Sequence, residues 1–432
     1  MNQGLVIALL KDEVIPAIGC TEPGAVALAA AHASEVLAGA IKNVEVIVNA
    51  NIYKNGIAVG IPGTGQEGLH IAAALGAIKK HSERKLSVLA GVTEAELQQA
   101  LDMLEDNKVS VSVDESKTSL WVQVLIRTDH EWSEAIIKDK HTNIVEIRQN
   151  GSTVYCQEDD RLQNNYDGRS ILRDNHLKVS QLIEVIESIP VDELRFVLDG
   201  VVMNTKAAEV GLAKKLGMGI GAAYEEMVAK GQLSNDLINY AKTLTAAAAD
   251  ARMSGASIDV MSSAGSGNHG LTVILPVYAA AKKLAVSEER LIRAVAISHL
   301  ITIYIKVYTG SLSALCGCAV AAAAGASAAI TWLMAGDQGA ISAAIKNTIG
   351  NLAGMICDGG KVGCALKLST AAAVAVESAL LAKRNIVVPA TNGIIAQAVE
   401  DTVKNLGKIS NPGMLTTDRV ILDILLSKDK VG

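Results

Sequence analysis

Four of the six cysteines in this chain lie in two glycine-rich stretches within its last third. The first stretch holds Cys316 and Cys318, and the second holds Cys357 and Cys364. Glycine lets the backbone approach a bound group closely, and thiolates are the ligands of iron–sulfur clusters and of many zinc sites. The cysteines therefore predict a metal centre built from both stretches.

The spacing inside the second stretch limits how it can bind a cluster. In a straight helix, Cys357 and Cys364 would lie about 10.5 Å apart along the axis, which is too far for one compact cluster. Asp358-Gly359-Gly360 interrupts the helix and lets the segment fold back. One cysteine of the first stretch then supplies a third ligand, and a four-iron cluster keeps one iron open as a Lewis acid. Zinc bound by four cysteines, or cysteines that only pack a small-residue core, are the alternatives.

Cys20 stands next to a predicted helix start. Thr21 is a favoured N-cap residue, Glu22 favours a first helical turn, and Pro23 is tolerated there. A helix N-terminus lowers the pKa of a nearby thiol, so the position predicts a reactive thiolate. The alternative is a small buried residue at a turn.

A third stretch, Met261 to Gly270, gathers several polar groups in front of a helix predicted over 271–284. It offers backbone N–H groups, hydroxyls, an amide and an imidazole, which suit an amino-acid carboxylate and a proton-transfer partner. A flexible loop with a surface histidine is the alternative.

The run Gly63–Gly68 matches a dinucleotide-binding pattern, but the preceding segment is predicted to be an antiparallel hairpin rather than a strand of a parallel crossover. We therefore expect a tight turn or an anion site.

The elements around these stretches indicate an α+β fold. Half of the residues are apolar but only 3% are aromatic, so closely packed Ala- and Gly-rich helices must form the core. We expect a large, Ala/Gly-rich all-helical domain and a smaller α+β domain of antiparallel strands. The predicted strands are 44–48, 57–61, 86–89, 109–113, 120–126, 143–147 and 153–156. The predicted divisions are 1–40 (helices carrying Cys20, packed on the helical domain), 41–170 (α+β, ending in a linker over 157–172) and 171–432 (helical catalytic domain).

Composition also limits partners and location. The net charge of −6 comes without a basic stripe, which argues against nucleic acid. No cationic signal-peptide start and no disulfide framework are present, so we expect a cytoplasmic protein. Residues 307–336 carry no charge and are long enough to cross a membrane, but Ser, Gly, Cys and Ala dominate them, which favours buried helices and no membrane contact. Ala-rich helices also favour packing between subunits of a homo-oligomer.

Four separated motifs together resemble the L-cysteine desulfidase family, whose relatives are the iron–sulfur L-serine dehydratases. The resemblance spans nearly the whole chain and is carried by Gly19–Pro23, Ser262–Gly270, Cys316–Ala322 and Cys357–Lys361. It implies an oxygen-sensitive [4Fe-4S] cluster and no pyridoxal phosphate (PLP). It also implies a small-molecule amino-acid substrate, with L-cysteine and water converted to pyruvate, ammonia and hydrogen sulfide.

Roles follow from the resemblance by position in the motifs. The cluster ligands would be Cys316, Cys357 and Cys364, with Cys318 as the other choice for the first. The dehydratases carry a pattern like Cys-Gln-Ala-Glu-Val-Gly after the corresponding cysteine. Cys316 is preferred because this pattern, started at Cys316, aligns without a gap and places its Val on Val320. Cys20 would remove the α-proton, and the groups that orient or protonate the substrate would be Asn268 and His269, with substrate contacts from Thr21, Glu22, Ser263, Ser266 and Gly267. Elimination from serine or another β-substituted amino acid, and a non-catalytic redox sensor, are the competing functions.

Overall fold

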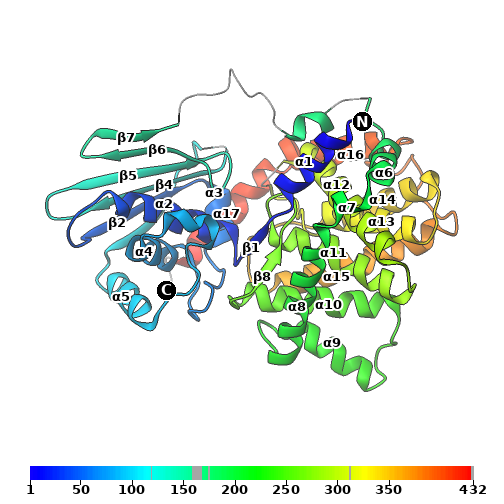
Figure 1. The fold of residues 1–432 in the computed structure, drawn as a ribbon, viewed down its shortest axis with the longest axis horizontal. Helices are drawn as coiled ribbons and strands as arrows, with labels where there is room; N and C mark the ends of the chain where they lie inside the picture. Colours follow the sequence, from blue (N-terminus) through cyan, green and yellow to red (C-terminus); the bar gives the residue numbers. More distant parts are fainter. Residues whose placement is uncertain (118, 158–167, 174–175, 311–312, 430–432) are drawn as a thin grey trace.

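The computed structural model describes residues 1–117, 119–157, 168–173, 176–310 and 313–429. An α+β unit and a larger helical unit lie side by side (Figure 1). The predicted α+β fold class, with its large helical part, is therefore confirmed.

The α+β unit is built on one six-stranded sheet of order β3-β2-β4-β5-β6-β7. The neighbours pair antiparallel except β2 and β3, which run parallel, so the sheet is mixed rather than purely antiparallel. Alternate residues of β2 and β4 are buried, as in a sheet covered on one face. The strands are β2 (Asn43–Val48), β3 (Val109–Val113), β4 (Trp121–Arg127), β5 (Trp132–Lys138), β6 (Ile144–Gln149) and β7 (Ser152–Cys156).

Helices α2 (Thr21–Glu35) and α4 (Leu69–Lys79) share a core with this sheet. Helix α5 (Glu94–Glu105) packs on α4 and starts at a capping box, in which Thr93 and Glu96 exchange hydrogen bonds. The short helix α3 (Ala50–Gly56) and the 3-10 helix η1 (Ser82–Ser87) complete the crossover between β2 and β3.

The helical unit surrounds one central helix, α13 (Val320–Leu333), which packs against α11, α12, α14 and α15. A Cβ on Gly325 would lie 2.2 Å from Thr302 Oγ1, so α12 and α13 approach as closely as the composition predicts. The other elements are α1 (Gln3–Glu13), α6 (Val179–Ser188), α7 (Val191–Leu194), α8 (Val197–Lys214), α9 (Ile220–Ala229), α10 (Leu237–Met253), α11 (Gly267–Lys283), α12 (Glu288–Thr309), α14 (Gln338–Leu352), α15 (Cys364–Ala382), α16 (Val399–Lys408), η3 (Gly168–Leu172) and η4 (Ile409–Gly413).

Two helices of this unit, α12 and α15, are long and apolar enough to cross a membrane by length and composition alone. In α12, 78% of the most apolar window is buried inside the protein, and in α15 the share is 61%. Within the described part of the uncharged segment 307–336 lie the last three residues of α12 and the 14-residue helix α13, whose residues are nearly all buried.

Two predictions about local structure are wrong, and one strand was missed. Residues 44–48 and 57–61 do not form a hairpin, because β3 and β4 occupy both edges of β2 and residues 50–56 are helical. The segment 86–89 is not a strand and lies at the end of η1. Strand β5 was not predicted, although it pairs with both β4 and β6.

The N-terminal 40 residues are shared between the two units, in contrast to the predicted division. Helix α1 packs in the helical unit, whereas α2 packs against the sheet. At the other end, α17 (Leu415–Asp429) returns to the α+β unit, where Leu422 is buried (Figure 1). Most of the predicted linker, 158–167, lies outside the described residues, and Cys156 is exposed on β7.

Candidate functional site

A two-stranded sheet brings the Cys20 motif to the Ser-Gly-Asn-His stretch. Strand β1 (Pro16–Ile18) pairs antiparallel with β8 (Asp259–Met261), with Ile18 opposite Asp259. Beyond β8, the Ser262 N–H and hydroxyl both donate to Ile15 O, at 2.9 and 2.6 Å. Chain segments more than two hundred residues apart therefore meet at one place.

Cys20, rather than Thr21, occupies the N-cap position of α2, and its side chain caps no backbone N–H group. The Cys20 thiol instead donates to Glu22 Oε2 at 3.1 Å, and the Thr21 hydroxyl donates to the same oxygen at 3.0 Å. Burial raises the pKa of Cys20, and the negative charge of Glu22 raises it further. The expected lowering by the helix start is thus overridden, and Cys20 rests as a thiol.

Asn55 of α3 connects this carboxylate to the second cysteine stretch. Its Nδ2 donates to Glu22 Oε1 at 3.2 Å, and its Oδ1 accepts from the Cys357 thiol at 3.9 Å. Two side chains, Glu22 and Asn55, therefore separate the Cys20 and Cys357 thiols. Asn55 could not be recognised from the sequence, because it lies between 44–48 and 57–61, the two segments predicted to form a hairpin.

The two cysteine stretches pair through their backbones. An isolated antiparallel bridge joins Leu315 to Ile356, with the Cys316 N–H donating to Met355 O at 2.9 Å and the Cys357 N–H donating to Ala314 O at 2.7 Å. The pairing brings together the two stretches on which the predicted ligands lie.

Glycine returns the second stretch to the start of α15. Gly359 has φ +105°, and a Cβ there would lie 2.1 Å from Lys54 O, so only glycine fits this turn against α3. Cys364 is the first residue of α15, and its sulfur lies 3.7 Å from Gly359 O. The predicted interruption of the helix at Asp358–Gly360 is present.

The four thiols lie within one another's electrostatic influence. A hydrogen bond with Cys318 lowers the pKa of Cys316 to about 7, and the same bond, together with burial, raises that of Cys318. Burial raises the pKa of Cys357, and it raises that of Cys364 to about 11. Among the described residues, no three His, Cys, Asp or Glu side chains stand in the arrangement of a metal site.

Lysine side chains lie close to these thiols. Burial lowers the pKa of Lys306 on α12 to about 8, and the charge of Arg169 acts in the same direction. Lys367 Nζ donates to Ile356 O at 2.8 Å and pairs with Asp358. Lys54 Nζ donates to Ser313 O at 3.4 Å and to Asp418 of α17 at 2.5 Å. Their positive charges favour deprotonated thiols.

His269 is buried near the start of α11, contrary to the surface-loop alternative. Its Nδ1 lies 3.0 Å from Ser263 O, so Nδ1 carries the proton and Nε2 is left as an acceptor. A Cβ on Gly317 would lie 2.5 Å from that Nε2, which places the imidazole against the first cysteine turn. Burial lowers the pKa of His269 to about 3, and the positive charge of Lys306 acts in the same direction. The imidazole ring is therefore neutral.

The other predicted substrate contacts line the same turn. Ser263 and Ser266 exchange backbone hydrogen bonds at 3.1 Å, and the Ser263 hydroxyl lies 2.9 Å from His299 Nδ1. Ser263 and Gly267 are buried, whereas Ser266 is half-buried.

Arg252 of α10 is a further site residue that the sequence did not reveal. Its guanidinium donates to Asn268 Oδ1 at 2.9 Å and to Gly19 O at 2.8 Å, and the side chain is only 3% exposed. A positively charged residue in the Ala-rich run before Gly255 was the available signal. Arg252 joins the motif around Cys20 to the one around Asn268.

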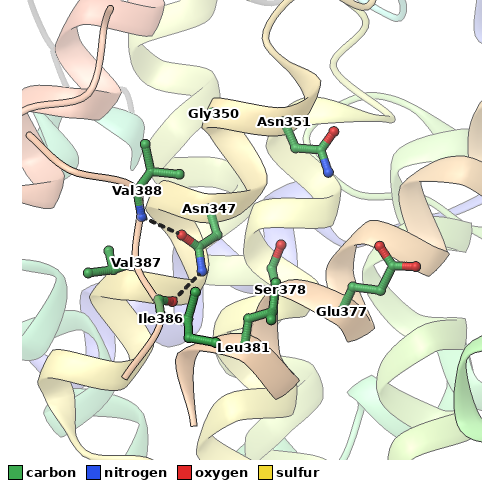
Figure 2. Close-up of a pocket in the computed structure, with 9 residues that line it drawn as sticks. All are labelled: Asn347, Gly350, Asn351, Glu377, Ser378, Leu381, Ile386, Val387 and Val388. Carbon is green, nitrogen blue, oxygen red and sulfur yellow. Dashed lines mark hydrogen bonds between the residues drawn. The ribbon is translucent and has the colours of Figure 1, made fainter. Parts of the chain in front are cut away.

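A surface pocket of about 340 Å³ lies elsewhere in the helical unit, and no predicted site residue lines it (Figure 2). There the Asn347 amide donates to Ile386 O and accepts from the Val388 N–H, both at 2.9 Å. These two hydrogen bonds hold the segment that follows α15 against α14.

Comparison with known proteins identifies the family of this chain. The sequence profile described as the serine dehydratase alpha chain matches residues 83–423. The chain is 46% identical over 425 residues to a UPF0597 protein of Clostridioides difficile (strain 630), covering 98% of this chain and 99% of the relative. It is 45% identical over 430 residues to one of Alkaliphilus oremlandii, covering 99% of each chain. The chain therefore belongs to the serine dehydratase alpha chain family.

Proposed function

We propose that this protein is an L-cysteine desulfidase, a lyase that converts L-cysteine and water to pyruvate, ammonia and hydrogen sulfide. The observation that carries the proposal is the path Cys20–Glu22–Asn55–Cys357, which connects a proton-transferring thiol to the paired cysteine stretches. Elimination needs both a base at the α-carbon and assistance to the leaving sulfur.

The donor set suits a [4Fe-4S] cluster held by Cys316, Cys357 and Cys364. Three thiols from the two paired turns supply soft ligands, and the lysine charges around them offset the negative charge of thiolates. Cys316 is favoured over Cys318 because its backbone pairs with the second stretch, where the Cys316 N–H donates to Met355 O at 2.9 Å. When bound, the cluster would supply a Lewis acid, and no PLP is needed.

The side chains of the chain itself would handle the proton transfers. Cys20 takes the α-proton, the Cβ–S bond breaks, and 2-aminoacrylate and hydrosulfide result. The aminoacrylate then hydrolyses to pyruvate and ammonia. Asn268, fixed by Arg252, would orient the substrate, and His269 would present its neutral Nε2 to a proton of the substrate or a water molecule. Thr21, Ser263, Ser266 and Gly267 would shape the site around the substrate.

L-Serine is the second candidate substrate, favoured by the description of the matching family profile. Loss of hydroxide from serine would use the same base, whereas the leaving group is poorer and needs protonation. A redox sensor without turnover would leave the proton-transfer path without a use. We place the protein in the cytoplasm and propose a homo-oligomer.

The test is purification without oxygen, followed by assays for iron, acid-labile sulfide and product release. Iron, sulfide and pyruvate formation from L-cysteine in preference to L-serine is the expected result. A bound cluster with faster pyruvate release from L-serine would identify a dehydratase, and a cluster without products would favour the sensor. Absence of iron after reconstitution, or binding of zinc alone, would overturn the proposal.

A further inference from the structure

We propose that Glu22 and Arg252 act together on Cys20, with Glu22 accepting the thiol proton and Arg252 stabilising the thiolate that results. This inference rests on the proposed role of Cys20 in removing the α-proton. It changes the role expected for Glu22 from substrate contact to proton acceptor, and it adds Arg252 as a positioning residue.

The Glu22 carboxylate contacts Cys20 directly. Glu22 Oε2 accepts from the Cys20 thiol at 3.1 Å, and Glu22 Oε1 accepts from Asn55 at 3.2 Å. Only 6% of Glu22 is exposed, so no bulk water competes for the thiol proton. Its fixed donors, Thr21 and Asn55, orient one carboxylate oxygen toward the sulfur.

The Arg252 guanidinium lies beside the Cys20 motif, because it donates to the carbonyl of the preceding residue, Gly19, at 2.8 Å. Burial and the charge of Glu22 raise the pKa of the Cys20 thiol, and the positive charge of Arg252 opposes them by lowering it. Its two terminal nitrogens are fixed on Gly19 O and Asn268 Oδ1. No ion pair joins Arg252 to a carboxylate within the residues described, and its Nε is buried without a hydrogen-bond partner there.

A buried cation without a counter-ion is costly, so formation of an anion beside it is favoured. A thiolate at Cys20 would be that anion. In the resting state, Glu22 holds the negative charge two residues away, and the thiol keeps its proton. Burial raises the pKa of Glu22, but the charge of His141 and the hydrogen bond from Cys20 outweigh it and lower that pKa. Transfer of the thiol proton to Glu22 is therefore uphill and depends on stabilisation of the thiolate by Arg252.

The proton transfers close into a cycle. The S–H bond of Cys20 breaks, its proton joins a Glu22 oxygen, and the electron pair stays on sulfur beside Arg252. The thiolate then accepts the α-proton of the substrate, which restores the S–H bond. The proton on Glu22 leaves with hydrosulfide as hydrogen sulfide, and the carboxylate is restored. No oxidant or reductant is required.

The test measures the Cys20 thiolate directly and does not depend on turnover. Purified protein is treated with iodoacetamide over a range of pH, and alkylation of the Cys20 peptide is followed by mass spectrometry. Alkylation follows the thiolate fraction, and one pKa unit changes that fraction tenfold. Arg252→Met should slow Cys20 alkylation about tenfold, and Glu22→Gln should accelerate it about tenfold. Both variants should lose turnover at unchanged iron content.

Controls separate this electrostatic role from a structural one. Arg293→Met removes a guanidinium that donates to Ile186 O, Glu187 O and Ile189 O in the helical unit, and it should leave Cys20 alkylation unchanged. Arg252→Lys should restore part of the alkylation rate because it keeps the charge. If Arg252 only supports the fold, its loss loosens the site and alkylation becomes faster, which would overturn the proposal. Normal alkylation responses in a protein inactive toward every amino acid would refute the proposed function alone.

Discussion

The Cys357 thiol donates a hydrogen bond to the Asn55 side chain, although 302 residues separate the two in the chain. Asn55 belongs to the α+β unit and Cys357 to a turn of the helical unit, so this contact joins the two cores at the site. The opposite end of the same amide holds Glu22, the hydrogen-bond partner of Cys20. The candidate site thus depends on correct docking of the two units.

Replacing Asn55 by leucine should lower kcat for L-cysteine about 100-fold while iron binding is retained. The substitution removes both hydrogen bonds of the amide and releases the Glu22 carboxylate, and loss of orientation at a reacting group costs rate of this order. Steady-state kinetics and iron analysis of the same preparation provide the measurement.

Asn51→Leu is the matched control for this variant. Asn51 lies on the same short helix, and its Oδ1 has no hydrogen-bond partner in the described part of the chain. Its replacement should leave kcat within about twofold of the parent, since no group at the site is held by it. An equal loss of kcat in both variants would mean that the rate depends on the integrity of α3 and not on the hydrogen bonds of Asn55.

Cys316→Ser should abolish iron binding, whereas Cys318→Ser should retain it. The Cys316 N–H donates to Met355 O, two residues before Cys357, so Cys316 is the cysteine of the first stretch that the backbone pairing holds against the second. Iron and acid-labile sulfide per chain, measured after anaerobic reconstitution, distinguish the two. Retention of the cluster by Cys316→Ser together with its loss from Cys318→Ser would reverse the ligand assignment.

The sequence revealed the residues with distinctive chemistry but not those with ordinary types in unexpected places. Cysteines, the Ser-Gly-Asn-His stretch and the glycines around them could be recognised from type and spacing. Arg252 and Lys306 could not be assigned a role, because each is a charged residue near the C-terminal end of a largely apolar helix, and its position along the chain does not show what it contacts. Their role depends on which loops those helices face.

Packing of whole helices was also beyond the sequence. Helix α2 is buried on nearly every side, so it carries no polar face from which its orientation could be predicted. Strand β2 likewise has two partners, and the local pattern at 57–61 could not show that β4, much later in the chain, occupies one edge. Long-range pairing therefore overrode local propensity at 50–61.

Gly325→Val should destabilise the protein by about 1–3 kcal/mol, as overpacking of a close-packed core does. A Cβ at this position already meets Thr302 Oγ1 at 2.2 Å and Ser298 O at 2.4 Å, and the second of these is backbone. The free energy of unfolding is measured from denaturant titration. Gly354→Val is the control, since a Cβ there meets no atom within 4 Å, and its midpoint should stay near that of the parent. Equal midpoints for both variants would contradict the close packing of α12 on α13.

Acid should destabilise the fold between pH 6.5 and about 3 through two buried histidines. Burial lowers the pKa of His269 and of His299 to about 3, against an ordinary value of 6.5. In this window the unfolded chain binds protons at these positions and the folded chain does not, so stability falls as pH falls. Each histidine contributes about 1.4 kcal/mol per pH unit.

The contribution of His299 can be isolated by His299→Gln. The glutamine side chain remains polar toward the Ser263 hydroxyl but cannot titrate, so the fall in unfolding free energy with acid should be shallower by about 1.4 kcal/mol per pH unit. Denaturant titrations at several pH values between 4 and 6, compared with the parent, provide the measurement, with constant ionic strength throughout. An unchanged slope in the variant would mean that His299 is protonated alike in the folded and unfolded chains, and that its burial does not hold the ring neutral.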